Sequence, residues 1–246
     1  VDVSTFEPPA PPVRPMDIKA VPPHPSGAWH PREVARLFSA YGLPMVAQEI
    51  CENDAAALAA AERIGWPVAL KAIDPAIVHK TEAGALALGL ASGEELTAAM
   101  REMRARMPGL AEWLVQRMAH GDAELLLGVR TDPQFGPQLV VGAGGVLVEL
   151  LHDVAVATVP MAASTAHKLL EQLKVAALLR GVRGKPALDA SAVVDVMVRL
   201  SWLAHDLRDQ LLELDINPLM VARSGVAIVD ARVLCRQKTG SRLAPG

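Results

Sequence analysis

Carboxylates and amides interrupt two apolar runs near the end of this chain. The first run covers residues 211–219, Leu-Leu-Glu-Leu-Asp-Ile-Asn-Pro-Leu, and the second covers residues 227–230, Ala-Ile-Val-Asp. Both runs are typical of strands, and Ser224-Gly225 between them marks a turn, so we predict a hairpin. Strands of this kind normally exclude Asp, Asn and Glu, because burying such groups without partners costs several kcal/mol.

Alternation along the first run places Glu213, Asp215 and Asn217 on one face of the strand. Oxygen ligands held on paired, rigid strands suit a hard cation such as Mg²⁺, particularly one that also binds nucleotide phosphates. The alternative is a hairpin whose polar side chains simply face water. The pattern alone leaves both interpretations open.

Two cationic or nucleophilic positions occur earlier. Lys71 follows the apolar residues 68–70 in a predicted strand, where its ammonium could bind a phosphate or extend to solvent. His79 lies in a polar loop, residues 74–84, and a neutral imidazole can take a phosphoryl group onto nitrogen. The alternative for His79 is an exposed loop histidine without a chemical role.

Two further segments could contact a nucleotide. Residues 112–124 predict a strand, a glycine-containing bend and a second strand, whose backbone amides could pair with an adenine edge while Glu124 accepts from ribose hydroxyls. An ordinary hairpin is the alternative. The glycines of residues 142–145 lack the order of a Walker loop, and we interpret them as a tight turn. The absence of Gly-x-Ser-x-Gly and His-Glu-x-x-His motifs disfavours acyl-serine and zinc hydrolases.

Composition limits the classes of protein to consider. The chain has 246 residues, of which 51% are hydrophobic and 21% charged, as expected for a globular protein with a substantial core. A net charge of −3 and an aromatic content of 3% argue against nucleic-acid binding. No signal peptide or membrane span is evident, and the two cysteines, Cys51 and Cys235, lack metal-type spacing. We therefore expect a cytoplasmic protein with reduced thiols.

The polar segments are distributed over an irregular alternation of helices and strands, which indicates an α+β fold. Residues 1–26 are Pro-rich and predict an arm or linker; the chain begins without Met, as an excised piece of a longer protein would. We expect helices at residues 31–40, 54–64, 93–107, 163–173 and 189–207. We expect strands at residues 45–50, 67–73, 85–90, 112–118, 124–130, 138–141, 146–151 and 154–159, followed by the hairpin.

In this order the segments resemble the ATP-grasp subunit of ADP-forming acetyl-CoA (acyl-CoA) synthetases, with the succinyl-CoA synthetase β-subunit as a more distant relative. The resemblance covers roughly residues 27–236 and is strongest at residues 65–84, 124–137, 142–149, 179–184 and 213–218. It implies an ATP-grasp fold in which two α+β lobes grip a nucleotide between them. The implied boundaries are a first lobe at 27–118, a second lobe at 119–238 and a tail at 239–246.

The resemblance also implies roles for individual positions. Lys71 would contact the nucleotide phosphates, and Asp215 would lie near a phosphohistidine, which His79 would form on a swinging loop. Further implied nucleotide contacts are Gly84, Gln116, Met118 and Glu124. Implied Mg²⁺ ligands are Asn217 and Asp230, with Glu213 in support. Two departures from the family pattern are Ala157, where Arg is common, and Ala85, where a second Gly is usual.

The implied activity is the reversible formation of ATP from ADP, phosphate and an acyl-CoA by a phosphohistidine relay, with Mg²⁺ and ATP or ADP as cofactors. The CoA-binding alpha subunit or domain of such enzymes is missing here, so the resemblance implies a hetero-oligomer or a fused partner. Two other classes stay open. One is a self-contained ATP-grasp ligase that joins a carboxylate to an amine, and the other is a non-catalytic nucleotide-sensing module.

Overall fold

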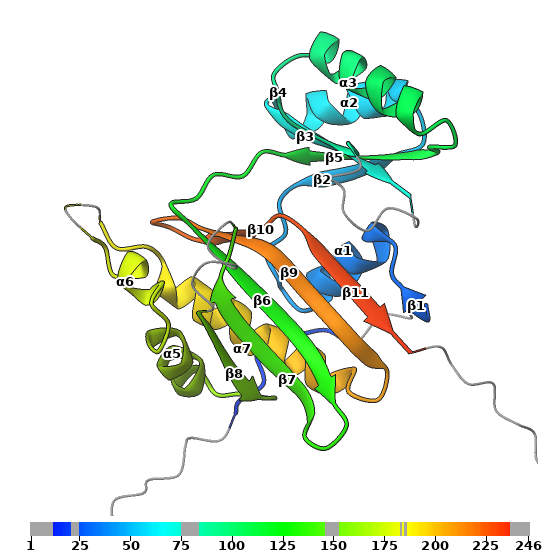
Figure 1. The fold of residues 1–246 in the computed structure, drawn as a ribbon. Helices are drawn as coiled ribbons and strands as arrows, with labels where there is room; N and C mark the ends of the chain where they lie inside the picture. Colours follow the sequence, from blue (N-terminus) through cyan, green and yellow to red (C-terminus); the bar gives the residue numbers. More distant parts are fainter. Residues whose placement is uncertain are drawn as a thin grey trace, which may run out of the picture. The chain divides into compact units, whose positions relative to one another are not determined.

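The computed structural model describes residues 12–20, 25–74, 84–145, 153–182, 184 and 186–236. The chain divides into two compact units, the larger formed by residues 1–45 and 120–246 and the smaller by residues 46–119 (Figure 1). The strand expected at 146–151 and the loop histidine His79 lie outside the described residues.

The smaller unit is an antiparallel four-stranded sheet with two helices on one face (Figure 1). Its strand order is β2-β5-β3-β4. Ala60, Leu96 and Met100 of the helices pack against Leu70 and Val115 of the sheet. The elements are β2 (Gln48–Cys51), α2 (Asp54–Ile64), β3 (Val68–Ile73), β4 (Leu86–Leu90), α3 (Gly93–Arg106) and β5 (Glu112–Arg117).

Local signals account for both helices of the smaller unit, and the predicted helices are confirmed. The Asn53 side chain accepts a hydrogen bond from the Ala56 amide at 2.8 Å and begins α2, which Gly65 ends at φ +88°. Ser92 caps α3 in the same way through the Glu95 amide. Arg104 then joins the two helices by an ion pair to Asp54 at 2.7 Å.

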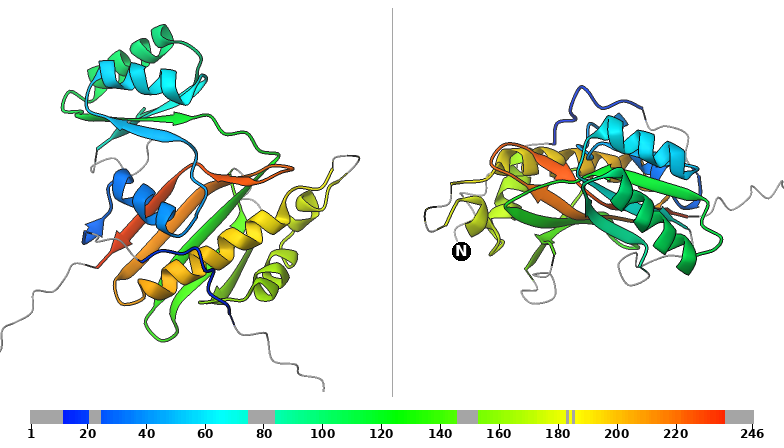
Figure 2. Two further views of the ribbon diagram at one scale, coloured as in Figure 1. Left: turned by 180° about the vertical axis from the view of Figure 1, so that it is seen from behind. Right: turned by 90° about the horizontal axis from the view of Figure 1, so that it is seen from above.

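The larger unit is a mostly antiparallel sheet in the order β1-β11-β9-β6-β7-β8, with β10 paired to β9. Helices α1, α5 and α7 lie on one face of this sheet (Figure 2). The strands are β1 (Gly27–Ala28), β6 (Ala123–Asp132), β7 (Gly136–Ala143), β8 (Val154–Thr158), β9 (Leu211–Val221), β10 (Val226–Ile228) and β11 (Ala231–Cys235). The helices are α1 (Pro31–Ala40), α5 (Ala163–Glu171), α6 (Ala176–Leu179) and α7 (Ala190–Asp206).

Residues 27–45, which the resemblance places in the first lobe, belong to the larger unit. The physical reason is the apolar side of α1, where Leu37, Phe38 and Tyr41 are fully buried in the core of the larger unit. The cysteines of both units, Cys51 and Cys235, are buried free thiols. None of the described helices is both long and apolar enough to cross a membrane.

Strand β9 lies at the centre of the larger sheet and pairs with β6, β10 and β11. Its apolar residues Leu214, Ile216 and Leu219 are fully buried in the core. A bulge interrupts the pairing with β6, because Leu127 lies opposite Ile216 and Leu125 lies opposite Leu219. Residues 217 and 218 of β9 therefore share one partner residue, and the bulge returns the following side chains to the core.

A buried and an exposed leucine of β9 predict different responses to truncation. Leu214→Ala removes a fully buried side chain and should lower the free energy of unfolding of the larger unit by about 2–5 kcal/mol. Leu212→Ala, the matched control on the same strand, removes a side chain that is 38% exposed and should cost less than about 1 kcal/mol. Urea denaturation followed by circular dichroism measures both, and equal losses would contradict the difference in burial.

Candidate functional site

A row of polar side chains follows β9 on the face of the sheet opposite the helices. Glu213 and Asp215 are half-buried and Asn217 is exposed, while the residues between them are in the core. The Asn217 amide donates to the carbonyl of Asp230 at 3.1 Å, which makes these two residues neighbours across β9 and the start of β11. Cross-strand neighbours share a face, so the predicted common face of Glu213, Asp215 and Asn217 is confirmed and also includes Asp230.

Two arginines flank the carboxylates of this row. Arg130 of β6 lies opposite Glu213, with 3.4 Å between its Nη2 and the Glu213 Oε1, and Arg232 of β11 lies opposite Asp215. Burial, followed by the hydrogen bond and the charge of Glu213, raises the pKa of Asp215 to about 6, and the two arginines partly oppose this rise. Glu213 and Asp215 are therefore an interacting pair of carboxyl groups between the cations Arg130 and Arg232.

Gly128 of β6 also faces the polar row. It lies directly opposite Asp215, and a Cβ added there would be in ordinary contact with the Asp215 Oδ1, at 3.4 Å. The sequence analysis missed Gly128, Arg130 and Arg232. The available signal was the alternation of Glu124, Leu126, Gly128 and Arg130 along β6, but only the register between strands shows which residues of β9 they face.

Glu124 lies on the same face at the other end of β6, beside the glycine-rich segment. The Gly144 amide donates to the Glu124 carbonyl at 2.8 Å. Gly145 has φ +60°, and the Glu124 carboxylate occupies the place where a side chain at Gly145 would begin. Only glycine fits this position without strain, so the segment 142–145 closes onto the predicted nucleotide-contacting acid.

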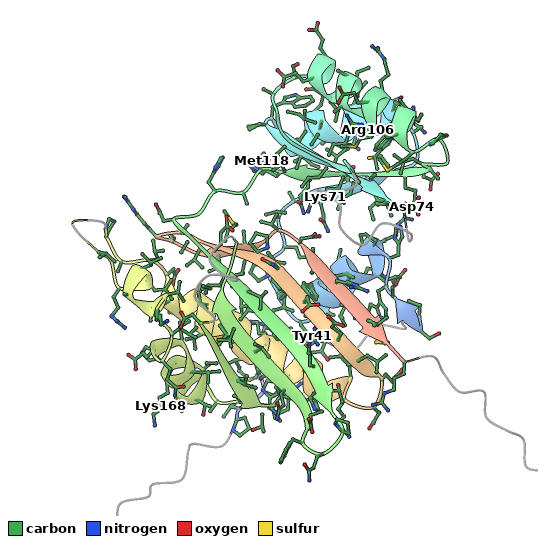
Figure 3. All side chains as sticks on the ribbon, in the orientation of Figure 1. Tyr41, Lys71, Asp74, Arg106, Met118 and Lys168 are labelled. Atoms are coloured by element: carbon green, nitrogen blue, oxygen red, sulfur yellow. The ribbon has the colours of Figure 1, made fainter. Side chains whose placement is uncertain are left out.

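Lys71 lies on the helix-free face of the smaller sheet (Figure 3). The register of β3 and β5 places Gln116 on the same face. Lys71 is only 4% exposed, so the interpretation of a side chain extended to solvent is wrong. Gln116 is 1% exposed, and its Nε2 donates to the Gln48 Oε1 at 2.8 Å. The register pairs Gln116 with Ala69, two residues before Lys71, so the two buried polar side chains are diagonal neighbours.

The segment 112–124 is not a hairpin. Its first strand, β5, pairs with β2 and β3 in the smaller sheet, and its second, β6, pairs with β7 and β9 in the larger sheet. Met118 lies between the two strands, and its amide donates to the Pro67 carbonyl at 3.2 Å. The ordinary-hairpin alternative is therefore wrong, and Met118 belongs to the connection between the units.

Three further positions of the family comparison are Gly84 and the two departures, Ala85 and Ala157. Gly84 has φ +63° and faces the guanidinium of Arg106. Ala85 is fully buried, and its carbonyl accepts from the Ala72 amide. Ala157 packs against the core from β8, on the helix side of the larger sheet. The structure thus places this departure from the family pattern on the face opposite Asp215.

Two buried or capping carboxylates were also missed, and both hold backbone in place. Asp153 accepts from the amides of Lys174 and Val175, each at 2.9 Å. Asp189 begins α7 through the Ala192 amide at 3.0 Å and accepts from the Gly225 amide at 2.8 Å in the turn between β9 and β10. Asp189 therefore ties the hairpin that carries Asn217 to the longest helix of the larger unit.

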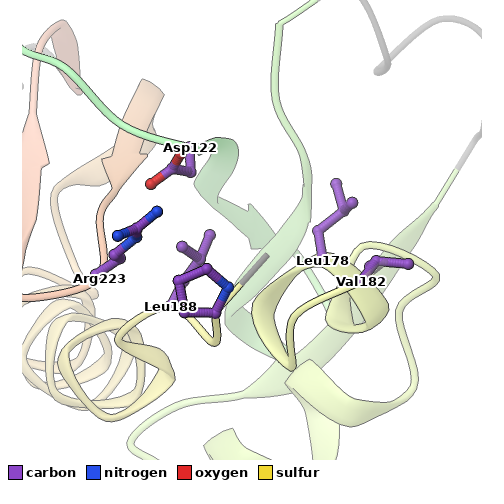
Figure 4. A pocket seen from close by; sticks show the side chains of 6 residues that line it. Asp122, Leu178, Val182, Leu188 and Arg223 are labelled. Carbon is purple, nitrogen blue, oxygen red and sulfur yellow. The ribbon is translucent and has the colours of Figure 1, made fainter. Parts of the chain in front are cut away.

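A small pocket lies beside this turn (Figure 4). Its volume is about 50 Å³, and charged side chains from Asp122 and Arg223 face apolar ones. The apolar lining residues are Leu178, Val182, Pro186 and Leu188. Asp122 directly precedes β6, so the pocket adjoins the strand that carries Glu124.

The donor set of the polar row suits a hard cation. Within the described ranges, no three His, Cys, Asp or Glu side chains gather into a metal-binding group. Asn217 and Asp230 instead offer an amide and a carboxylate oxygen side by side, with Asp215 and Glu213 next along the strand. Mg²⁺ commonly takes one or two carboxylates and completes its shell with phosphates and water, so such a partial set fits it.

Residues 24–235 match the ATP-grasp domain family. The chain belongs to this family. Its fold is the ATP-grasp fold, as predicted. The predicted resemblance to ADP-forming acetyl-CoA synthetases is confirmed by similarity to their beta subunits and domains.

Three relatives illustrate how this ATP-grasp chain compares with known proteins. It is 35% identical to acetate–CoA ligase (ADP-forming) II subunit beta of Pyrococcus furiosus, over 83% of this chain and 90% of that one. It is 37% identical to acetate–CoA ligase (ADP-forming) I of Archaeoglobus fulgidus, over 80% of this chain but 30% of that protein. The third is an acetyl-coenzyme A synthetase of Ca. Korarchaeum cryptofilum, solved with coenzyme A and Mg-AMPPCP and with its phosphohistidine segment pointing towards the nucleotide binding site. That structure has a TM-score of 0.76 and 33% identity, over 85% of this chain and 93% of that one.

The interacting pair of carboxyl groups predicts a specific titration. Asp215 should titrate near pH 6 in the native ATP-grasp chain, as measured by the pH dependence of its ¹³C carboxyl resonance. Glu213→Gln removes a negative charge next to Asp215 and should lower its pKa. Arg130→Ala removes a nearby positive charge and should raise it. An Asp215 pKa that is the same in both variants would contradict the coupling.

Proposed function

We propose that this chain is the nucleotide-binding ATP-grasp part of an ADP-forming acyl-CoA synthetase. With a CoA-binding partner, it would convert acyl-CoA, ADP and phosphate reversibly into a carboxylic acid, CoA and ATP. The observation that carries the proposal is the row Glu213, Asp215, Asn217 and Asp230 on one open face of an ATP-grasp sheet. Polar side chains along one face of a strand whose other face is fully buried support a role in binding.

Asn217 and Asp230 are the proposed Mg²⁺ ligands, with Glu213 in support. When bound, Mg²⁺ would neutralise the charge that develops on the transferred phosphoryl group. Lys71 would add a second positive charge at the phosphates, and its burial makes that charge more effective because water screens it less.

The proposed contacts to the rest of the nucleotide come from backbone and from one acid. Residues Gln116 and Met118 would present backbone groups to the adenine edge, Glu124 would accept from ribose hydroxyls, and Gly84 would allow close approach of the chain. The packing of Gly144 and Gly145 against Glu124 supports this, because the hydrogen bond from the Gly144 amide holds the Glu124 backbone in place before any ligand binds.

His79 is the proposed phosphoryl carrier. A phosphohistidine of the partner would transfer its phosphoryl group to the His79 imidazole, and the N–P bond so formed would break as a terminal oxygen of ADP attacks phosphorus. The products are ATP and free His79, so the step balances. Ionised Asp215 would accept a hydrogen bond from the second imidazole nitrogen and fix the ring for transfer.

The proposed partner is a CoA-binding alpha subunit or domain. The Pyrococcus furiosus relative is named a subunit beta, and this chain spans only 30% of the longer Archaeoglobus fulgidus relative. Both facts support an enzyme in which the acyl group and CoA bind to another subunit or domain.

Incubation with γ-³²P-labelled ATP and Mg²⁺ tests the proposal without a partner. Acid-labile, base-stable label should appear on the chain and map to His79, because the relay is reversible. His79→Ala should abolish the label, and Asn217→Ala should reduce it at least tenfold. ATP binding without label would identify a nucleotide-sensing module. Label in His79→Ala, or ATP hydrolysis stimulated by an amine and a carboxylate, would favour a self-contained ligase.

A further inference from the structure

An N-terminal segment that precedes the ATP-grasp match is docked on the larger unit. Residues 12–20 are described, whereas the family match begins at residue 24. Figure 2 shows this segment, in dark blue, crossing the outside of α7. The sequence analysis expected residues 1–26 to be an arm or linker and assigned them no contact.

One attachment point is the C-terminal end of α7. Arg14 forms an ion pair with Asp206 at 2.8 Å, its guanidinium lies 5.4 Å from the centre of the Trp202 ring, and the Trp202 Nε1 donates to the Val13 carbonyl at 3.3 Å. An aspartate in the last turn of a helix opposes the helix dipole. Asp206 is instead stabilised by hydrogen bonds that Arg14 and the hydroxyl of Tyr41 donate to its carboxylate.

The second attachment point lies two helical turns earlier. Asp17 forms an ion pair with Arg199 at 2.8 Å, and Arg199 also binds Asp195 and the Tyr41 carbonyl. Beyond it, the Lys19 amide donates to the Ala40 carbonyl at 2.9 Å. The segment runs antiparallel to α7, so that Arg14 meets Asp206 and Asp17 meets Arg199, and each charge has a partner of opposite sign. Reversing the direction would place like charges together.

We infer that the outer face of α7 is a docking surface for residues 13–18, an extension that precedes the family match and lies on the helix side of the larger unit. The helix side is opposite the face that carries Glu213, Asp215 and Asn217. The docked segment therefore lies away from the polar row. This inference does not depend on the proposed activity.

Amide exchange in the full chain tests the docking. The Trp202 indole N–H and the Lys19 amide should be protected in the native protein, and Arg14→Ala combined with Asp17→Ala should speed their exchange at least tenfold. Arg36→Ala is the matched control, because Arg36 pairs only weakly, at 3.7 Å, with Glu33 of its own helix. Amides of α2 should be unchanged in every variant. Exchange at Trp202 and Lys19 within twofold of wild type would overturn the docking.

Discussion

The larger unit depends on one strand that must satisfy two opposite demands. Strand β9 contributes fully buried leucines and an isoleucine to the core on one face and carboxylates and an amide on the other. Because side chains alternate along a strand, a slip of one residue would bury Glu213 and Asp215 under the helices and expose the core. Burying those charges would cost free energy, so the register that keeps the core apolar is also the register that keeps the polar row on the other face.

The neighbouring strands then adjust the chemistry of that row. Arg130 provides charge from β6, Arg232 provides charge from β11, and the Asp230 carbonyl accepts a hydrogen bond from the Asn217 amide. The bulge at residues 217 and 218 lets Asn217 stay on the open face while Leu219 returns to the core. Asp189 holds the turn of the same hairpin from the start of α7. A site of this kind is rigid before ligand binds, which suits a transfer reaction that needs alignment more than covalent help.

Much of this arrangement follows from the sequence, because its causes are local. The caps Asn53 and Ser92 and the alternation of residues 211–217 identify helices and a polar strand face without reference to the rest of the chain. The bulge, strand β11 and the pairing of Arg130 with Glu213 were missed, since they depend on which strands become neighbours. The apolar pattern of residues 112–124 does not reveal their split between two sheets, because each strand has the pattern of a hairpin arm; only the resemblance implied a boundary, at residue 118. The docking of Arg14 and Asp17 depends on charges almost two hundred residues away in sequence.

The central claim is that the open face of β9 binds the metal ion of a metal–nucleotide complex. Replacing Mg²⁺ by paramagnetic Mn²⁺ in the presence of ADP, and mapping the broadening of backbone amide resonances, tests it most directly. The account predicts that broadening is strongest at Asp215, Asn217 and Asp230 and weak along helix α7, on the other face of the sheet, and that Asn217→Ala combined with Asp230→Ala abolishes it. Broadening centred elsewhere, or unchanged by the two substitutions, would contradict the account.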